Sequence, residues 1–187
     1  MRVVGANIQV ELPVVIAELG AIADRLALAR EAIEELRASH PQSPESNVKA
    51  TYMSPWKSHL LNDKLRPLCA SVVEIAQAAA PKAWSGDVGA LGLELVVTHC
   101  WGAVYEQADH TVPHNHWPAD LSCVVYLEAE PGCAPLVFSK TSVYQPRPAT
   151  LVMFPGIAMH EVPATPGRRV VVAMNLFKRL ALTAAAG

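Results

Sequence analysis

The sequence predicts an α+β fold in which two helices precede an antiparallel β-sandwich or jelly roll. Two observations support this fold class. Two segments within the first 85 residues have apolar side chains every three or four positions, and after Gly86 apolar and polar residues alternate over short runs. Because these short runs follow one another without helices between them, we expect their strands to pair antiparallel and to form two packed sheets.

Two amphipathic helices are expected in the first part of the chain. The first spans Leu19–Leu36, where apolar residues on one face oppose charged residues on the other. A loop follows at residues 40–47, which contain two prolines among small polar residues. The second helix covers Leu65–Ala79, starting near Pro67 and ending before Pro81, because proline lacks the N–H donor that a helix interior requires.

Short strand-like runs make up the second part of the chain. Apolar residues alternate with other residues from Leu91 to Thr98, and turns containing Pro and Gly separate the later runs. These later runs are Trp101–Tyr105, Ser122–Leu127, Leu136–Phe138, Leu151–Phe154 and Val170–Leu176. We therefore expect one domain over residues 1–187, with a helical part at 1–85, a jelly-roll core at 86–177 and a tail at 178–187 that frays over Ala184–Gly187.

Length and composition limit the classes of function. A chain of 187 residues is one domain, and 51% apolar against 17% charged residues allow a sizeable core. The net charge of −2 produces no field that attracts nucleic acid, so no such partner is expected. No apolar run approaches the roughly 20 residues that a bilayer requires, and Met1–Val10 lacks the basic segment of an export signal. These features predict a soluble cytoplasmic protein with no membrane partner.

The cysteines agree with a reducing compartment. Cys69, Cys100, Cys123 and Cys133 contain no Cys-x-x-Cys pair and are too few to cross-link a domain of this size, so we expect reduced thiols in the core. The oligomeric state stays open at this point. The apolar face of the Leu19–Leu36 helix offers one surface through which a dimer could form.

Histidines give the clearest signal for chemistry. His114 and His116 lie two positions apart before a strand, and side chains at that spacing in an extended segment point to the same face. Both imidazoles can then bind one metal ion, with His160 as a third ligand from a distant turn. The alternative interpretation is three polar loop histidines that never meet, and spacing alone does not decide between the two.

Two families of metal-dependent hydrolases do not fit this pattern. Metallo-β-lactamases need His-x-His-x-Asp, whereas the next acid here is Asp120, four residues after His116. Amidohydrolases place His-x-His on the first strand of an α/β barrel of roughly 250 residues, which is longer than this chain.

Several motifs follow one another in the second part of the chain: Trp101-Gly-Ala-Val-Tyr105, Pro113-His-Asn-His116, Ser122-Cys-Val-Val-Tyr-Leu127, Leu151-Val-Met-Phe-Pro155, His160 and Arg169-Val-Val-Val-Ala-Met-Asn175. Their order resembles that of the iron(II)- and 2-oxoglutarate-dependent oxygenase superfamily. They lie within residues 91–177, and Ser46–Ser54 is similar to a further feature of the superfamily. The closest resemblance within it is to uncharacterised oxygenases of phages and marine bacteria. The resemblance implies a double-stranded β-helix, a jelly roll whose two sheets enclose an iron ion.

The resemblance also implies site residues. His114 would be the first metal ligand and His160 the distal one, while Arg169 would bind the far carboxylate of 2-oxoglutarate. An arginine suits that task because its planar fork makes two parallel charge-assisted hydrogen bonds. Arg168, its neighbour on the expected strand, points to the opposite face and is expected to be a solvated charge.

Two positions depart from the family pattern. The superfamily usually has an acid two residues after the first histidine, whereas this chain has His116, which gives an apparent three-histidine centre. The metal identity therefore stays open, as does an arrangement with His116 as first ligand and Asp120 as the acid. A serine that often follows the arginine is replaced by Val171, so Tyr126 or Tyr105 is expected to supply the second contact to the cosubstrate.

These residues together predict a non-haem iron(II)- and 2-oxoglutarate-dependent dioxygenase that hydroxylates an unidentified small-molecule or peptide substrate. Two alternatives stay open: a cupin-type three-histidine dioxygenase that does not use 2-oxoglutarate, and a non-catalytic metal-binding jelly roll. Substrate contacts are expected from the loops at Glu106–Thr111 and Lys140–Arg147, because loops carry specificity in such folds. Trp56 and Trp101 are assigned to packing.

Overall fold

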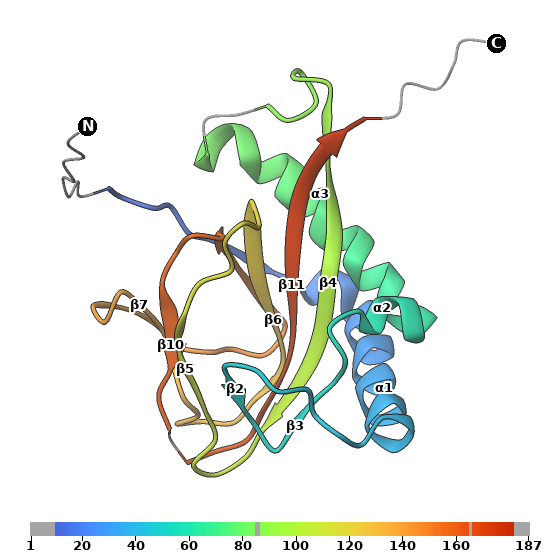
Figure 1. Ribbon diagram of the computed structural model, residues 1–187, viewed down its shortest axis with the longest axis vertical. Coiled ribbons are helices and arrows are strands. Elements are labelled where there is room, and N and C mark those ends of the chain that lie inside the picture. The colour runs from blue at the N-terminus through green and yellow to red at the C-terminus, as the bar shows by residue number, and fades with distance from the viewer. Residues whose placement is uncertain (1–9, 85–86, 165, 182–187) are drawn as a thin grey trace, which may run out of the picture.

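The computed structural model describes residues 10–84, 87–164 and 166–181. Two β-sheets lie side by side, and the helices cover the outer face of the larger sheet (Figure 1). The helices are the 3₁₀ turns η1 (Gly20–Ile22) and η2 (Asp63–Leu65) and the α-helices α1 (Ala23–Ser39), α2 (Ser58–Leu61) and α3 (Arg66–Ala83). The strands are β1 (Val15–Glu18), β2 (Val48–Lys49), β3 (Tyr52–Met53), β4 (Leu93–Tyr105), β5 (His110–His114), β6 (Leu121–Ala129), β7 (Leu136–Phe138), β8 (Ser142–Tyr144), β9 (Thr150–Pro155), β10 (His160–Val162) and β11 (Arg169–Leu180).

The larger sheet has the strand order β1-β9-β6-β11-β4-β3, and the smaller sheet has the order β2-β5-β10-β7-β8. Neighbouring strands in both sheets run antiparallel. The predicted pair of antiparallel sheets with helices is therefore confirmed. Strand β11 is central to the larger sheet, because it pairs with β4 on one side and with β6 on the other.

The core between the helices and the larger sheet is tightly packed. Gly102 of β4 faces α1, and a Cβ atom at this position would lie only 2.5 Å from Cγ1 of Ile33. Ile33 and Leu36, which form the apolar face of α1, are at most 2% exposed because their own chain covers them. This face is therefore not available for the dimer contact considered from the sequence.

Helix α3 continues through Pro81 to Ala83, so the predicted end before this proline was wrong. Pro81 lies in the last turn, where its missing N–H removes one hydrogen bond near the end of a helix that the rest of α3 already stabilises. The backbone N–H of Trp84 still donates to the carbonyl of Ala80 at 3.0 Å, and this bond closes the final turn.

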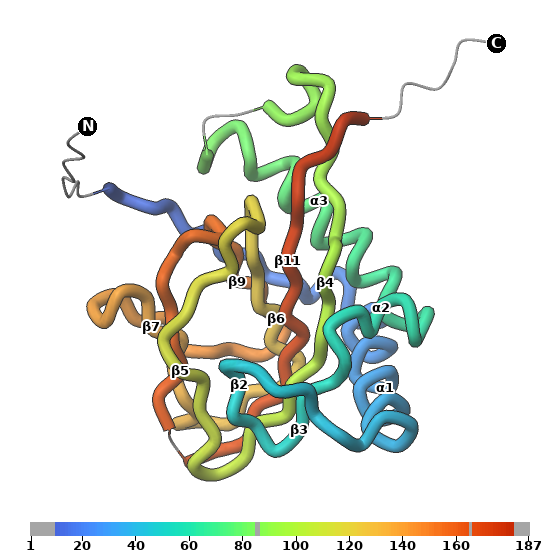
Figure 2. The backbone as a smooth tube through the Cα atoms, in the orientation of Figure 1, coloured from blue at the N-terminus to red at the C-terminus, as the bar shows by residue number. Residues whose placement is uncertain are grey.

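The first 85 residues are not purely helical, contrary to expectation. Strand β1 pairs with β9 at the edge of the larger sheet. The segment after α1 crosses to β5 and forms β2 and β3 before it returns to α2 (Figure 2). These strands have two to four residues, which is too short for a two-residue periodicity to be recognised. At the other end, β11 reaches Leu180 and so enters the predicted tail, while Ala184–Gly187 lies outside the described residues.

In the second part of the chain, the structure contains strands with polar residues that were not predicted. The runs from Leu91 and from Trp101 form one long strand, β4, which bends at a bulge opposite Asn175. Strands β5 and β10 were not predicted, because each is short and contains a histidine where an apolar residue would mark a strand. All four cysteines are buried and free, as expected. Within the described residues, no helix is long and apolar enough to cross a membrane.

Candidate metal centre

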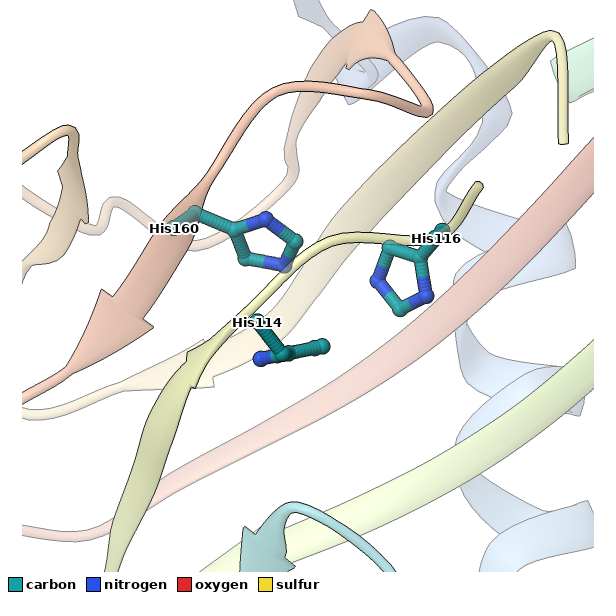
Figure 3. Close-up of side chains that lie close together, drawn as sticks. All are labelled: His114, His116 and His160. Carbon is teal, nitrogen blue, oxygen red and sulfur yellow. The ribbon is translucent and has the colours of Figure 1, made fainter. Parts of the chain in front are cut away.

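Three histidines from two distant parts of the chain meet between the two sheets (Figure 3). His114 is the last residue of β5, His116 follows it by two positions, and His160 is the first residue of β10. One ring nitrogen from each lies within 4.8 Å of the others. The three rings are 4.3 to 5.0 Å apart between their centroids. The structure therefore brings together the three residues that the sequence singled out, and the interpretation as separate loop histidines does not hold.

Backbone hydrogen bonds fix the tautomer of two of these rings. Nδ1 of His114 lies 2.8 Å from the carbonyl oxygen of Val112, and Nδ1 of His160 lies 2.9 Å from that of Ala158. A carbonyl oxygen only accepts, so each Nδ1 carries the proton and donates it. Nε2 is then unprotonated, and its lone pair is free to bind a metal ion.

Burial keeps all three imidazoles neutral. Burial and, to a lesser extent, the neighbouring histidines lower the pKa of His116 to about 3 and that of His160 to about 4. Burial also lowers the pKa of His114. Within the part of the chain that the structure describes, no carboxylate joins the cluster. The donor set is therefore three uncharged nitrogens.

Asp120 does not complete this cluster. Its carboxylate pairs with Nζ of Lys178 at 3.0 Å and accepts a hydrogen bond from the backbone N–H of the same residue at 2.8 Å. The side chain lines a different cavity, next to Trp84 at the end of α3. The arrangement in which Asp120 supplies the acidic ligand therefore has no support in the geometry.

A narrow inner cavity of ≈ 40 Å³ extends from the three histidines between the sheets, with Arg169 in its wall. Arg169 is 3% exposed, and its guanidinium carbon lies 4.1 Å from the ring centroid of Tyr105. One terminal nitrogen donates to the carbonyl of Ala134 at 2.8 Å, whereas Nε is buried without a partner in the described protein. Arg168 is instead paired with Glu106 and Glu128, away from the cavity.

The two predicted tyrosines line the same inner cavity. The hydroxyl of Tyr105 is hydrogen bonded to Oγ1 of Thr111 at 2.8 Å. Tyr126 is 1% exposed, and burial raises the pKa of its phenol, so it stays protonated and keeps a donor proton. Val171, at the position where the family often has serine, also lines this cavity.

A second, outer cavity of ≈ 500 Å³ opens beside His114 and His116. It lies against Trp56 and Trp101. Trp56 is exposed, so its assignment to the core was wrong, whereas Trp101 is buried in the core as expected and also borders the cavity. The other side chains that line it are Asn47, Val48, Lys57, His99, Asn115 and Asn175. The two cavities share Val48, Trp101, His114 and His116, which places the candidate metal centre at their junction.

No family model matches this chain, and no curated protein sequence does. Many solved structures match its fold, however. A prolyl 4-hydroxylase from Pseudomonas putida is 18% identical, with a TM-score of 0.64 over 90% of this chain and 94% of that one. SnoK, a non-haem α-ketoglutarate-dependent carbocyclase from nogalamycin biosynthesis, is 14% identical with a TM-score of 0.67 over 95% and 85%.

A third similar structure is the collagen prolyl hydroxylase of Paramecium bursaria Chlorella virus-1, solved as a 2-oxoglutarate complex. It is 13% identical, with a TM-score of 0.57 over 87% of this chain and 94% of that one. This chain has the fold of the 2-oxoglutarate- and iron(II)-dependent oxygenases. The narrower resemblance to phage and marine bacterial members stays a prediction.

Some residues in the cavity walls were not assigned to the site from the sequence. His99 and Trp101 lie on the same face of β4 as the predicted Tyr105, so the two-residue periodicity of this strand contained a signal for them. Lys57 lies between short elements, where no periodicity indicates a direction. The loops expected to contact substrate contribute little: Glu106–Thr111 adds Thr111 to the inner cavity, and Lys140–Arg147 lines neither cavity.

Proposed function

We propose that this protein is a non-haem iron(II)- and 2-oxoglutarate-dependent dioxygenase that hydroxylates a substrate bound in the outer cavity. One observation carries the proposal: three neutral histidines and a buried arginine with an unpartnered Nε share one narrow cavity. In such a cavity the histidines would bind a metal ion, and the arginine would bind one carboxylate of a small dicarboxylate that also contacts the metal.

The three histidines fit a divalent transition metal. His114 and His160 would bind through Nε2, because their Nδ1 atoms are hydrogen bonded to backbone carbonyls. Imidazole suits iron(II), zinc and copper alike, so the donor set fits iron without selecting it. The rings of Phe138 and Phe154 pack against His160, with centroids 6.1 and 4.8 Å from its own, and keep water away from this side of the centre.

Arg169 fits the far carboxylate of 2-oxoglutarate. A buried cationic N–H without an acceptor is costly, and a carboxylate oxygen would satisfy it. The cavity has room for about three water molecules, or for one slender carboxylate arm. Tyr105, stacked on the guanidinium and held by Thr111, would keep the arginine in place, and the Tyr126 hydroxyl is available as a further donor.

When bound, iron(II) and 2-oxoglutarate supply the oxidising chemistry, in which oxygen is reduced as the cosubstrate gives succinate and carbon dioxide. The chain itself provides binding, orientation and exclusion of water. Hydroxylation is the outcome we propose. The similar structures include a carbocyclase as well as prolyl hydroxylases, so the fold is compatible with more than one outcome.

A three-histidine dioxygenase that does not use 2-oxoglutarate is the second candidate. The absence of a carboxylate from the described cluster favours it, because cupin-type centres bind their metal through three histidines. Arg169 favours the first candidate, since a centre without a dicarboxylate leaves the buried Nε of this cation without an acceptor among the described residues. A closed, non-catalytic jelly roll is less compatible with the structure, because a cavity of ≈ 500 Å³ reaches His114 and His116.

Anaerobic titration distinguishes the candidates. Ferrous iron followed by 2-oxoglutarate should produce a visible charge-transfer absorption band, because the cosubstrate chelates the metal through two oxygens. The same sample should form succinate when air is admitted. His160→Ala should show neither signal, whereas Lys82→Gln, an exposed change on α3, should retain both. Iron binding without the band would contradict the proposal and support the second candidate.

A further inference from the structure

The outer cavity has an uneven distribution of charge. Lys57 is the one charged side chain among the described residues that line it, and no carboxylate does so. Lys57 makes no ion pair with another described residue. His99 lies in the same wall, and burial and the charge of Lys57 lower its pKa, so this ring stays neutral. The cavity is therefore cationic.

Asn175 adds a hydrogen-bond donor to the same wall. It is 8% exposed, and its Oδ1 accepts a hydrogen bond from the hydroxyl of Ser122 at 2.8 Å. This bond fixes the orientation of the amide. Nδ2, which only donates, then has no acceptor among the described residues and remains for a ligand in the cavity.

Two indole rings provide an apolar surface next to these donors. Trp56 and Trp101 meet edge to face, with centroids 4.9 Å apart and planes at 65°. The backbone holds this arrangement in place, because the carbonyl of Trp56 accepts from the N–H of Cys100 at 2.9 Å and Lys57 forms a bridge with the same residue. Lys57 and the indole pair are thus attached to β4, the strand that carries His99 and Trp101.

We propose that the outer cavity binds a small organic substrate that has a flat apolar body, packed against Trp56 and Trp101, and one anionic group paired with Lys57. The volume of ≈ 500 Å³ is that of a small-molecule site. The indole pair offers the dispersion surface that an aromatic or otherwise planar group requires. That this ligand is the molecule acted upon rests on the proposed function, whereas its binding does not.

Two cationic groups then serve two different anions. Arg169 lines the inner cavity but not the outer one, and Lys57 lines the outer cavity but not the inner one. His114 and His116 line both cavities. The cosubstrate and the substrate would therefore approach the metal centre from separate sides. Because each anion has its own cationic partner, the cosubstrate and the substrate can be bound at the same time without competing for Arg169.

Calorimetric titration with three matched probes tests the proposal: 3-phenylpropionate, its uncharged amide and the corresponding amine 3-phenylpropylamine. We expect the carboxylate to bind about five- to tenfold more tightly than the amide. This factor corresponds to a binding free energy between that of an exposed ion pair and that of a charge-assisted hydrogen bond. Lys57→Gln should remove this preference while leaving the affinity for the amide unchanged. Lys57→Glu should make the amine the tightest of the three. Lys82→Gln is the matched lysine control and should behave as the unaltered protein.

Three outcomes would overturn the inference: equal affinity for carboxylate and amide, a preference that survives in Lys57→Gln, or no binding of any probe. A Trp56→Ala variant adds a second check, because it should weaken the carboxylate and the amide by the same factor. The anaerobic iron and 2-oxoglutarate titration is run on the same preparations, and Lys57→Gln should keep the absorption band. A missing band with an intact carboxylate preference would refute the proposed function alone, and the reverse result would refute this inference alone.

Discussion

His114 and His160 lie directly opposite each other in the antiparallel pairing of β5 with β10. Each ring also donates from Nδ1 to the carbonyl two residues earlier in the chain, Val112 in one case and Ala158 in the other. The same local geometry is thus used twice, on two strands that the chain brings together from 46 positions apart. Register and tautomer together orient the two Nε2 atoms before any ion is bound.

His160→Ala should abolish metal binding while the protein stays folded. The change removes one of three nitrogens, and the remaining pair is a weak site for any divalent ion. Bound iron, measured after reconstitution and desalting, should fall to near zero, and circular dichroism should be unchanged. His110→Ala, which removes a histidine of β5 outside the cluster, serves as the control and should keep its iron. Full iron occupancy in His160→Ala would refute the centre.

The sequence predicted this centre in part, for a definable physical reason. His114 and His116 were recognisable because the two-residue periodicity of an extended segment places their side chains on one face. His160 required the register between β5 and β10, which is a long-range property that no local pattern contains. His160 was therefore only a candidate from its place after a turn, and the resemblance to a family then assigned it as the distal ligand and indicated Arg169.

Other features could not be read locally because tertiary contacts determine them. Pro81 remained inside α3 since the cost of one lost hydrogen bond is small against the burial of that helix. Trp56 and Lys57 obtain their positions from a backbone contact with Cys100 on β4, more than 40 residues later. Strand β10 has only three residues, so its pairing partners rather than its composition define it.

Arg169→Gln should weaken 2-oxoglutarate binding strongly. A lost charge-assisted pair costs about 1.5–3 kcal/mol, which corresponds to roughly 10- to 150-fold in affinity. The titration of the absorption band with 2-oxoglutarate measures this change directly. Arg168→Gln is the matched control, because this arginine pairs with Glu106 and Glu128 and lies outside the cavity. A larger effect from Arg168 than from Arg169 would show that the assignment of the two is reversed.

The metal-free protein should lose stability as the pH falls from about 6.5 toward 4. The pKa of His116 is about 3 and that of His160 about 4 in the folded state, both lowered from 6.5 mainly by burial. Below pH 6.5 the unfolded chain therefore binds protons that the folded chain does not, so the free energy of unfolding decreases. The slope contributed by each histidine is at most about 1.4 kcal/mol per pH unit.

Urea unfolding at a series of pH values measures this slope. Carboxyl groups titrate in the same range, so the comparison between variants is what isolates the cluster. His160→Gln should have a shallower dependence than the unaltered protein. His40→Gln, which changes an exposed histidine beyond the end of α1, should leave the slope unchanged. Identical slopes in all three proteins would contradict the buried, neutral state of His160.

Gly156→Ala should disturb the segment that holds His116. A Cβ at Gly156 would collide with the carbonyl oxygen of Ala119, which is backbone and cannot rotate away. The carbonyl of Gly156 also accepts the N–H of His116 at 2.7 Å, so a displaced turn moves this ligand. We expect a loss of about 1–3 kcal/mol in the free energy of unfolding and weaker iron binding. Gly20→Ala, where the added atom meets nothing within 4 Å, should change neither quantity.

The last prediction concerns the position at which this chain departs from the usual two-histidine, one-carboxylate pattern. His116→Asp should keep ferrous iron, because the side chain lies beside the rings of His114 and His160 and an aspartate there restores an anionic oxygen ligand. Asp120→Ala should also keep its iron, since this carboxylate is engaged with Lys178. Its effect should instead be a modest loss of stability, within about 1 kcal/mol for a partly exposed ion pair.

Iron stoichiometry in these two variants separates the two possible ligand sets. If His116 itself is the third ligand, both proteins retain iron and only His116→Ala loses it. If His116 were the first ligand and Asp120 the acid, His116→Asp would lose the metal and Asp120→Ala would lose it as well. The observed contacts favour the first set, because the chain would have to break the Asp120–Lys178 pair and reverse the direction of this side chain to reach the ion. Near-complete loss of iron from Asp120→Ala would therefore refute the three-histidine centre.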